Sequence, residues 1–235
     1  MLKAALNGSR PLGCHPALPT TPDELAADAA ACVRAGVAAL HIHPRSSAGV
    51  ETLDPEIVDE TVRVVRAATG APVGVSTGAW IEDNPLRRAD LISCWREPDM
   101  ASVNLSEEGA TLVIEALLEA GIGVEAGIWT PGDAERLAAS GFATRVARVL
   151  VEIVHPTHDP VRDAMAIQET LSRLGIEGPI LVHGEEEATW PVMRHAKVLG
   201  YDTRIGLEDT LYLPDGSVAT SNSALVEAAM ALGTR

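Results

Sequence analysis

Lysine is almost absent from this sequence, whose 235 residues include only Lys3 and Lys197. A Schiff-base or pyridoxal mechanism requires a desolvated lysine in the active site. We expect Lys3 to open the first strand and Lys197 to lie late in a helix, so neither is expected to provide such a nucleophile. The sequence therefore argues against chemistry that proceeds through a lysine imine.

Positive charge, long apolar runs and cysteine are also scarce. The formal net charge is −15 and the sequence pI is about 4.8, so the surface would repel phosphate backbones and anionic lipids. No apolar run reaches the roughly 18 residues of a membrane-spanning helix. The three cysteines are an odd number and show no CxxC spacing. This pattern is typical of reduced thiols in a cytoplasmic protein. We therefore expect a cytoplasmic protein without nucleic-acid or membrane partners.

The sequence does contain a regular alternation of short apolar runs with longer stretches of helical period. Hydrophobic residues make up 46% of the chain, enough for a sizeable core. The pattern occurs eight times. The predicted strands are residues 2–6, 38–43, 72–76, 100–104, 122–125, 148–154, 179–183 and 203–207. The predicted helices lie near residues 22–35, 55–69, 84–96, 107–120, 131–140, 159–174, 186–199 and 221–233.

This alternation predicts an α/β fold with a parallel sheet. The strands are nearly continuously apolar, as parallel strands covered by helices are. Several helices are expected to end at a glycine just before the next strand, at Gly36, Gly70, Gly121, Gly141, Gly175 and Gly200. Eight repeats favour a single (β/α)8 TIM barrel over residues 1–235. A doubly wound open sheet remains the alternative, because the strand count alone does not show closure.

Polar residues follow the predicted strands, and the strand beginnings are mostly apolar. Barrel enzymes carry their chemistry at the C-terminal ends of the strands. In chain order these ends provide Asn7, His41 with His43, Ser76, Asn104, Glu125, Glu152, His183, and Glu208 with Asp209. The asymmetry predicts one concentrated site at one end of the barrel.

The segment that contains His41 and His43 predicts a metal site. Residues two apart on a strand point the same way, so both imidazoles would face one point at the barrel mouth. Glu208 follows the eighth strand, which neighbours the first in a closed barrel. Two histidines, a glutamate and an open position suit zinc, although manganese, cobalt or nickel could occupy the same ligands. The alternative is a pair of buried, hydrogen-bonded histidines.

Arg204, Glu208 and Asp209 form a second group of interest. Arg204 and Glu208 share one face of the last strand, whereas Asp209 points elsewhere, nearer the mouth, where it could act as a base. A glutamate–aspartate pair in a loop is often only solvated. The strand before it is apolar except for Arg204, which argues against simple exposure.

Together these residues resemble a known family, the β-keto acid cleavage enzymes, whose founding activity is the cleavage of 3-keto-5-aminohexanoate. The likeness covers nearly the whole chain, and its most specific segments are HxHxR and RxGxED. The matching stretches are residues 5–8, 18–24, 41–45, 76–78, 101–104, 204–209 and 221–222.

The resemblance implies a homo-oligomeric barrel, a dimer or a tetramer, that binds zinc through His41, His43 and Glu208. It also implies that a β-keto acid is condensed with acetyl-CoA to give acetoacetate and a new acyl-CoA. The expected catalytic residues are Asp209, Arg204 and Ser76. The expected substrate-binding residues are Asn7, Arg10, Ser102, Asn104 and Glu125.

In the mechanism that this implies, Asp209, oriented by Arg204, removes the C2 proton of the keto acid. Zinc stabilises the resulting enolate, which attacks the acetyl thioester. CoA then moves to the former keto carbon, and a retro-Claisen step splits the product. Ser76 and Asn104 would donate hydrogen bonds to the developing oxyanions.

The chain departs from the family pattern at two places. Arg10 stands where the aminohexanoate enzymes have an acidic residue that meets the substrate amine, which predicts a neutral or anionic distal group; Glu125 favours the opposite. After the sixth strand, residues 154–159 replace a longer glycine-rich segment, which leaves the CoA contact and the acceptor open. Two other functions therefore remain: a metal-dependent retro-aldol lyase or hydrolase on the same barrel, and a non-catalytic barrel that binds a small acid.

Overall fold

The computed structural model describes residues 1–232 and contains eight strands in one sheet. Each strand is short, between three and six residues. The strands are β1 (Leu2–Ala5), β2 (Ala39–Ile42), β3 (Val73–Ser76), β4 (Met100–Asn104), β5 (Gly123–Ile128), β6 (Arg148–Ile153), β7 (Ile180–Gly184) and β8 (Thr203–Ile205).

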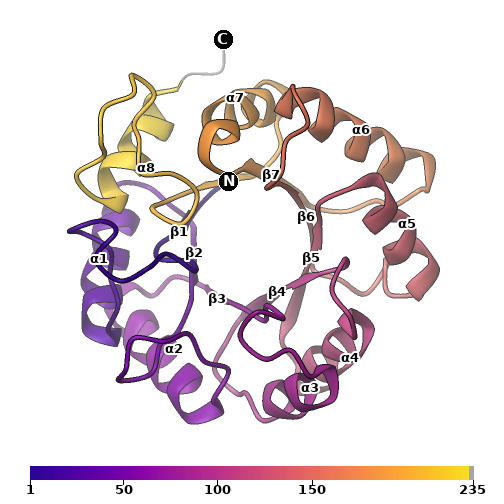
Figure 1. Cartoon of the computed structure of the whole chain (residues 1–235), viewed down its shortest axis with the longest axis horizontal. Helices are drawn as coiled ribbons and strands as arrows, with labels where there is room; N and C mark the ends of the chain where they lie inside the picture. Colours follow the sequence, from indigo (N-terminus) through magenta and orange to yellow (C-terminus); the bar gives the residue numbers. More distant parts are fainter. Residues whose placement is uncertain (233–235) are drawn as a thin grey trace.

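A helix follows each strand and packs on the outside of the sheet (Figure 1). The helices are α1 (Pro22–Arg34), α2 (Pro55–Thr69), α3 (Pro85–Ser93), α4 (Ala110–Ala120), α5 (Pro131–Ser140), α6 (Pro160–Arg173), α7 (Thr189–Leu199) and α8 (Asn222–Ala231), with a 3-10 turn η1 (Glu186–Ala188) before α7. Within residues 1–232 no helix is both long and apolar enough to cross a bilayer.

The sheet closes on itself, so the fold is a (β/α)8 barrel and the predicted barrel is confirmed over the open sheet. All neighbouring strands are parallel in the order β7-β6-β5-β4-β3-β2-β1-β8. Asp202, next to β8, joins the two outer strands: its N–H donates to Ile180 at 3.2 Å, and its carbonyl accepts from Val182 at 2.9 Å. Figure 1 shows the strands as a ring with the helices around it.

Local sequence signals explain where several helices begin and end. Thr21 caps α1 in a capping box with Glu24, and Pro22 occupies the first turn. Gly70 and Gly121 close α2 and α4 with φ of 66° and 78°, a left-handed conformation that glycine adopts without steric cost. These predicted boundaries are confirmed.

Other boundaries differ from the prediction. β5 continues to Ile128, three residues past Glu125, which therefore lies within the strand. β8 ends at Ile205 rather than at residue 207, because the chain turns and Asp209 N–H bonds back to Gly206 O at 2.9 Å. Residue 233, the last of the predicted eighth helix, lies outside the described residues, and α8 ends at Ala231.

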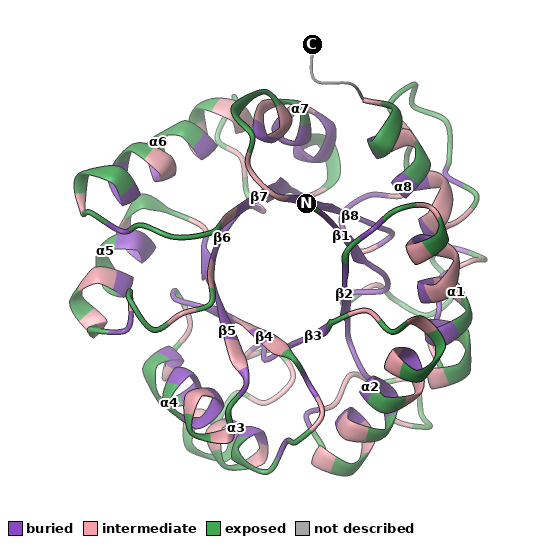
Figure 2. Ribbon diagram, turned by 180° about the vertical axis from the view of Figure 1, so that it is seen from behind, coloured by how far each residue is buried: buried purple, intermediate pink, exposed green. Residues whose placement is uncertain are grey.

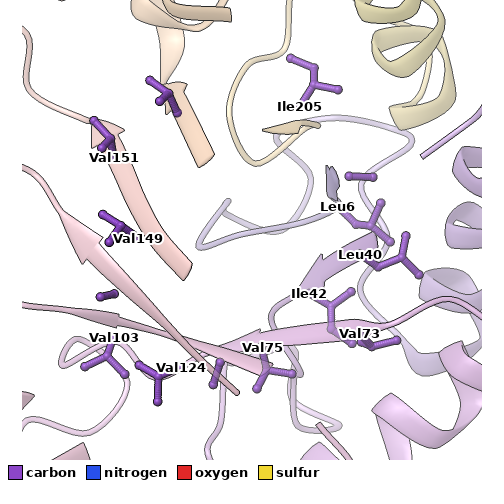
Figure 3. Close-up of a cluster of buried hydrophobic side chains, with 14 of the residues drawn as sticks. Leu6, Leu40, Ile42, Val73, Val75, Val103, Val124, Val149, Val151 and Ile205 are labelled. Carbon is purple, nitrogen blue, oxygen red and sulfur yellow. The ribbon is translucent and has the colours of Figure 1, made fainter. Parts of the chain in front are cut away.

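The two faces of the sheet have opposite character. The outer faces carry aliphatic residues that pack against the helices, and the strands are buried while the outward sides of the helices are exposed (Figure 2). Figure 3 shows Leu40 and Ile42 on β2 beside Val73 and Val75 on β3. The alternate residues face the barrel interior and are mostly polar: Lys3, His41, His43, Ser76, Ser102, Asn104, Glu125, Arg148, Glu152, His183 and Arg204.

The barrel interior holds a buried ion pair between Lys3 and Glu125. Both side chains are 1% exposed, and Arg148 Nη1 lies 3.5 Å from Glu125 Oε1. Gly74 leaves room for the lysine, because a Cβ there would lie 3.2 Å from Lys3 Nζ. Lys3 is therefore desolvated, but it does not line the cavity at the strand ends. Lys3 is paired with Glu125 and does not face a substrate, so Lys3 remains unsuited to imine chemistry.

Candidate metal centre

A cavity of about 250 Å³ opens at the C-terminal ends of the strands, where a barrel places its active site. Its walls combine His41 on β2 and His43 directly after it with arginine, serine, glutamate and tryptophan side chains from the seven other strands or their following loops. The lining residues are Ser9, Arg10, Pro11, His41, His43, Ser76, Trp80, Ser102, Asn104, Trp129, Glu152, Glu185, Glu186, Arg204 and Glu208.

The structure brings together the three predicted ligands, His41, His43 and Glu208. The two Nε2 atoms are 3.1 Å apart, and Glu208 Oε1 lies 3.8 Å from His41 Nε2 and 3.7 Å from His43 Nε2. Donors bound at about 2.0–2.1 Å to one tetrahedral ion lie roughly 3.3 Å from one another. Glu208 Oε2 is buried and has no hydrogen-bond partner among the described residues. These donors fit a shared divalent ion.

The backbone around these ligands is closely packed. Gly8 has φ of 52°, and a Cβ there would come within 2.4 Å of Glu208 Cγ, so the glycine leaves room for the carboxylate. Asn7 is fully buried behind the site: its amide donates to His43 O and its Oδ1 accepts from His43 N, both at 2.9 Å. Asn7 therefore holds the β2 end in place and does not line the cavity.

Burial and charge act differently on the two histidines. Burial lowers the pKa of His41 well below its ordinary value, although Glu208 opposes the shift. Burial also lowers the pKa of His43, but the carboxylates of Glu208 and Glu51 outweigh it and raise that pKa to about 9. A bound cation would displace any proton on Nε2, since a histidine ligand must be deprotonated there.

Arg204 connects Glu208 to Asp209 at the floor of the cavity. Its Nη2 donates to Glu208 Oε1 and to Asp209 Oδ1, each at 2.8 Å, and its Nε lies 3.1 Å from Asp209 Oδ1. Asp209 is fully buried, and its Oδ2 has no partner among residues 1–232. Burial raises the pKa of Asp209 well above its usual range, against the opposing effect of Arg204. Asp209 thus lies behind Arg204 rather than on the cavity wall.

Glu152 and His183 form a second acid–base pair, to which the sequence analysis assigned no role. Arg204 Nε donates to His183 Nδ1 at 3.2 Å, so the neutral ring carries its proton on Nε2 and donates it to Glu152 Oε2 at 3.1 Å. Trp129 Nε1 donates to the other oxygen of Glu152 at 3.3 Å. Burial raises the pKa of Glu152 to about 7. The strand-end pattern included both residues, but only the geometry pairs them.

The predicted substrate-binding residues and Ser76, which was predicted to be catalytic, do not all lie in the cavity. Ser76, Ser102 and Asn104 line the cavity, as does Arg10. Arg10 is paired, because its Nη1 lies 2.5 Å from Glu186 Oε1 and its Nε donates to Leu207 O at 2.9 Å. Glu125 lies outside the cavity, bound to Lys3 inside the barrel. The structure therefore does not bring Glu125 to the site with the others.

A (β/α)8 barrel with buried acid–base groups and a set of metal donors at its C-terminal strand ends belongs to the barrel enzymes. The particular family follows from the sequence profile of the beta-keto acid cleavage enzymes, which matches residues 1–235, so the chain belongs to that family. The 3-keto-5-aminohexanoate cleavage enzyme of Fusobacterium nucleatum subsp. nucleatum is 25% identical over 254 residues, covering 97% of this chain and 88% of that protein. The predicted family and its enzymatic nature are confirmed.

Solved structures add support for the fold alone. The type I 3-dehydroquinate dehydratase of Clostridium difficile has a TM-score of 0.62 at 10% identity, over 96% of this chain and 90% of that one. The N-acetylmannosamine-6-phosphate 2-epimerase of Clostridium perfringens has a TM-score of 0.60 at 14% identity, over 89% and 87%. Both are similar to this chain in their barrel architecture.

Proposed function

We propose that this protein is a zinc-dependent enzyme that transfers an acyl group between a β-keto acid and acetyl-CoA. The products are acetoacetate and the CoA ester of the remaining part of the keto acid. The observation that carries the proposal is the convergence of His41, His43 and Glu208 on one cavity wall, beside the Arg204–Asp209 pair. Membership of an enzyme family favours catalysis over a non-catalytic acid-binding role.

The metal would be held by the two histidines and the glutamate, where it would supply a Lewis acid that lowers the cost of forming an enolate at C2. Zinc suits this donor set, and manganese, cobalt and nickel are the alternatives. Arg204 keeps its charge when buried and orients Asp209 through two contacts to one oxygen.

Asp209 serves as the base in this proposal, since its second carboxylate oxygen has no hydrogen-bond partner among the described residues and burial raises its pKa. A raised pKa makes a carboxylate a stronger base toward a carbon acid. Because Arg204 separates Asp209 from the cavity wall, proton transfer requires that the guanidinium move aside or that a water molecule connect the two. Ser76 and Asn104, which line the cavity on neighbouring strands, donate hydrogen bonds to the oxyanions in this proposal.

The distal group of the keto acid is proposed to be neutral. The prediction of a neutral or anionic group relied on Arg10, but in the structure Glu186 neutralises that charge. Glu152 and Glu185 face the same cavity, and both have a pKa raised to about 7 by burial. A second anionic group on the substrate would lie near Glu152, Glu185 and Glu186, whose carboxylates would repel it. A clear preference in kcat/KM for amino-bearing or for dicarboxylic β-keto acids over neutral ones would contradict this assignment.

The test is a panel of β-keto acids incubated with acetyl-CoA and zinc-loaded protein, with acetoacetate as the readout. Acetoacetate that appears only when both substrates and the metal are present supports acyl transfer. Cleavage of a keto acid at the same rate without acetyl-CoA would instead identify a retro-aldol lyase or a hydrolase. The short segment after β6 makes this acetyl-CoA dependence the decisive measurement.

The assembly and location of the protein are part of the same proposal. A homo-oligomer, a dimer or a tetramer, is expected in the cytoplasm. Size-exclusion chromatography with light scattering measures the assembly directly, and a monomer at micromolar concentration would contradict it.

A further inference from the structure

We propose that Glu51 is a positioning residue for the metal centre, because its carboxylate fixes the ring of His43 as a metal ligand. Neither the strand-end pattern nor the family motifs pointed to Glu51, which lies in the loop after β2. The inference rests on the metal site of the proposed function. It does not depend on the identity of the keto acid or of the acyl acceptor.

The contact between the two side chains determines which nitrogen of His43 is available. Glu51 Oε2 lies 2.7 Å from His43 Nδ1, on the side of the ring away from the other two ligands. A carboxylate only accepts hydrogen bonds, so Nδ1 carries a proton and Nε2, which faces His41 and Glu208, is the nitrogen left to bind a cation. This arrangement is the one by which an outer carboxylate orients a metal-binding histidine and raises its basicity.

Trp80 completes the support on the open side of the site. Its Nε1 donates to the same Glu51 oxygen at 3.2 Å, and its ring stacks on His43 with centroids 6.3 Å apart and an interplanar angle of 18°. A Cβ at position 78 would lie within 2.3 Å of the indole, so Gly78 permits the close approach. Although Trp80 is 52% exposed, its contact with Glu51 holds the indole ring over His43.

The neighbouring ligand lacks such support. His41 Nδ1 is buried and has no hydrogen-bond partner among the described residues, whereas His43 is held at Nδ1 by Glu51 and along its backbone by Asn7. Of the two imidazoles, His43 is therefore the one whose Nδ1 is held by a partner among the described residues. Glu51 itself is not in the group of donors that could share a cation, and it acts through His43.

Zinc affinity of the full-length protein, measured by competition with a chromophoric chelator, tests the assignment. Glu51→Gln and Glu51→Ala are expected to weaken zinc binding by about 10–100-fold, the usual cost of losing an outer-shell partner. The alanine variant should lose more, because a glutamine oxygen still accepts a hydrogen bond from Nδ1. Glu56→Gln is the matched control: it removes the same charge from an exposed position nearby and should leave the affinity within twofold.

Thermal unfolding of the metal-free variants establishes that they are folded. A folded Glu51→Ala protein that binds zinc within twofold of the wild type overturns the proposal, and if that variant does not fold, Glu51→Gln is judged by the same criterion. An equal loss in Glu56→Gln would also overturn it, since the effect would then be one of net charge. A wild type that binds zinc tightly but forms no acetoacetate would contradict the proposed function alone and leave the role of Glu51 intact.

Discussion

Breaking the ion pair inside the barrel should cost a large share of the protein's stability. Glu125→Gln leaves the ammonium of Lys3 buried without its counter-charge, and Arg148, also cationic, lies nearby. Removing one partner of a buried pair typically destabilises a protein by about 3–5 kcal/mol. An independent bound comes from Lys3 itself, which can lose its proton. The ordinary lysine pKa lies roughly 3.4 pH units above neutrality, so this costs at most about 5 kcal/mol at pH 7.

Thermal unfolding followed by circular dichroism measures this cost. For a chain of this length, 1 kcal/mol corresponds to about 2–4 °C in Tm, so Glu125→Gln should lower Tm by roughly 6–20 °C. Lys3→Met/Glu125→Gln removes both charges and should recover most of that loss, because it also removes the cost of burying two ions. The two single variants, Lys3→Met and Glu125→Gln, complete the double-mutant cycle.

The pH dependence gives a second check on the same reasoning. Burial lowers the pKa of Lys3 even with Glu125 present, and the pKa should fall further in Glu125→Gln. The unfolded chain then binds more protons than the folded one between the lowered pKa and the ordinary lysine value, so the variant should gain stability as pH rises through that window. A Tm loss below about 2 °C at pH 7, or a double variant as unstable as the sum of the singles, would refute the ion-pair account.

Three further predictions concern the cavity. Glu208→Gln should abolish stoichiometric zinc binding in equilibrium dialysis, since it removes the carboxylate of the proposed donor set; retention of one tightly bound zinc would exclude Glu208 as a ligand. Gly8→Ala should weaken zinc binding at least about tenfold in the same assay, because the new Cβ meets Glu208 and the backbone has positive φ; unchanged affinity would show that the loop relaxes freely. Burial raises the pKa of Glu152 to about 7 in the folded protein. At pH values between the ordinary glutamate pKa and about 7, the folded protein therefore binds more protons than the unfolded chain. The metal-free protein should thus lose stability as pH rises from 5 to 7, and Glu152→Gln should flatten this slope in melts across that range; an identical slope would count against the shift.

The fold could be predicted from the sequence because its signals are local and repeated. The strand–helix alternation, and glycines such as Gly70 and Gly121, each depend on a few neighbouring residues. The histidine pair was also predictable, since residues two apart on a strand necessarily point the same way. Its meeting with Glu208 then followed from barrel closure, which places β8 beside β1.

The buried charges could not be placed in the same way. Glu125 interrupts an apolar run, so sequence reasoning ends the strand there, whereas the strand continues to Ile128 and the carboxylate turns inward to Lys3. To predict that Glu125 points into the barrel, one must know that it pairs with Lys3, which lies 122 residues away in the chain. Glu51 was missed for a similar reason, because its contact with His43 depends on how a loop folds back over the ligand.

Each strand has an aliphatic side and a polar side, and the two sides tolerate different kinds of substitution during evolution. Residues that face the helices hold the barrel together, so exchanges there are limited by volume. Axis-facing residues at the cavity, such as Ser76 and Ser102, contribute little apolar packing, so they can be replaced one at a time to suit a new acid or acceptor. The paired charges of Lys3 and Glu125, deeper in the barrel, can be exchanged without loss only together. An insertion of a single residue within a strand would lose both properties at once, since it would turn the charged set toward the helices. Changes in length should therefore be confined to the connections between the elements.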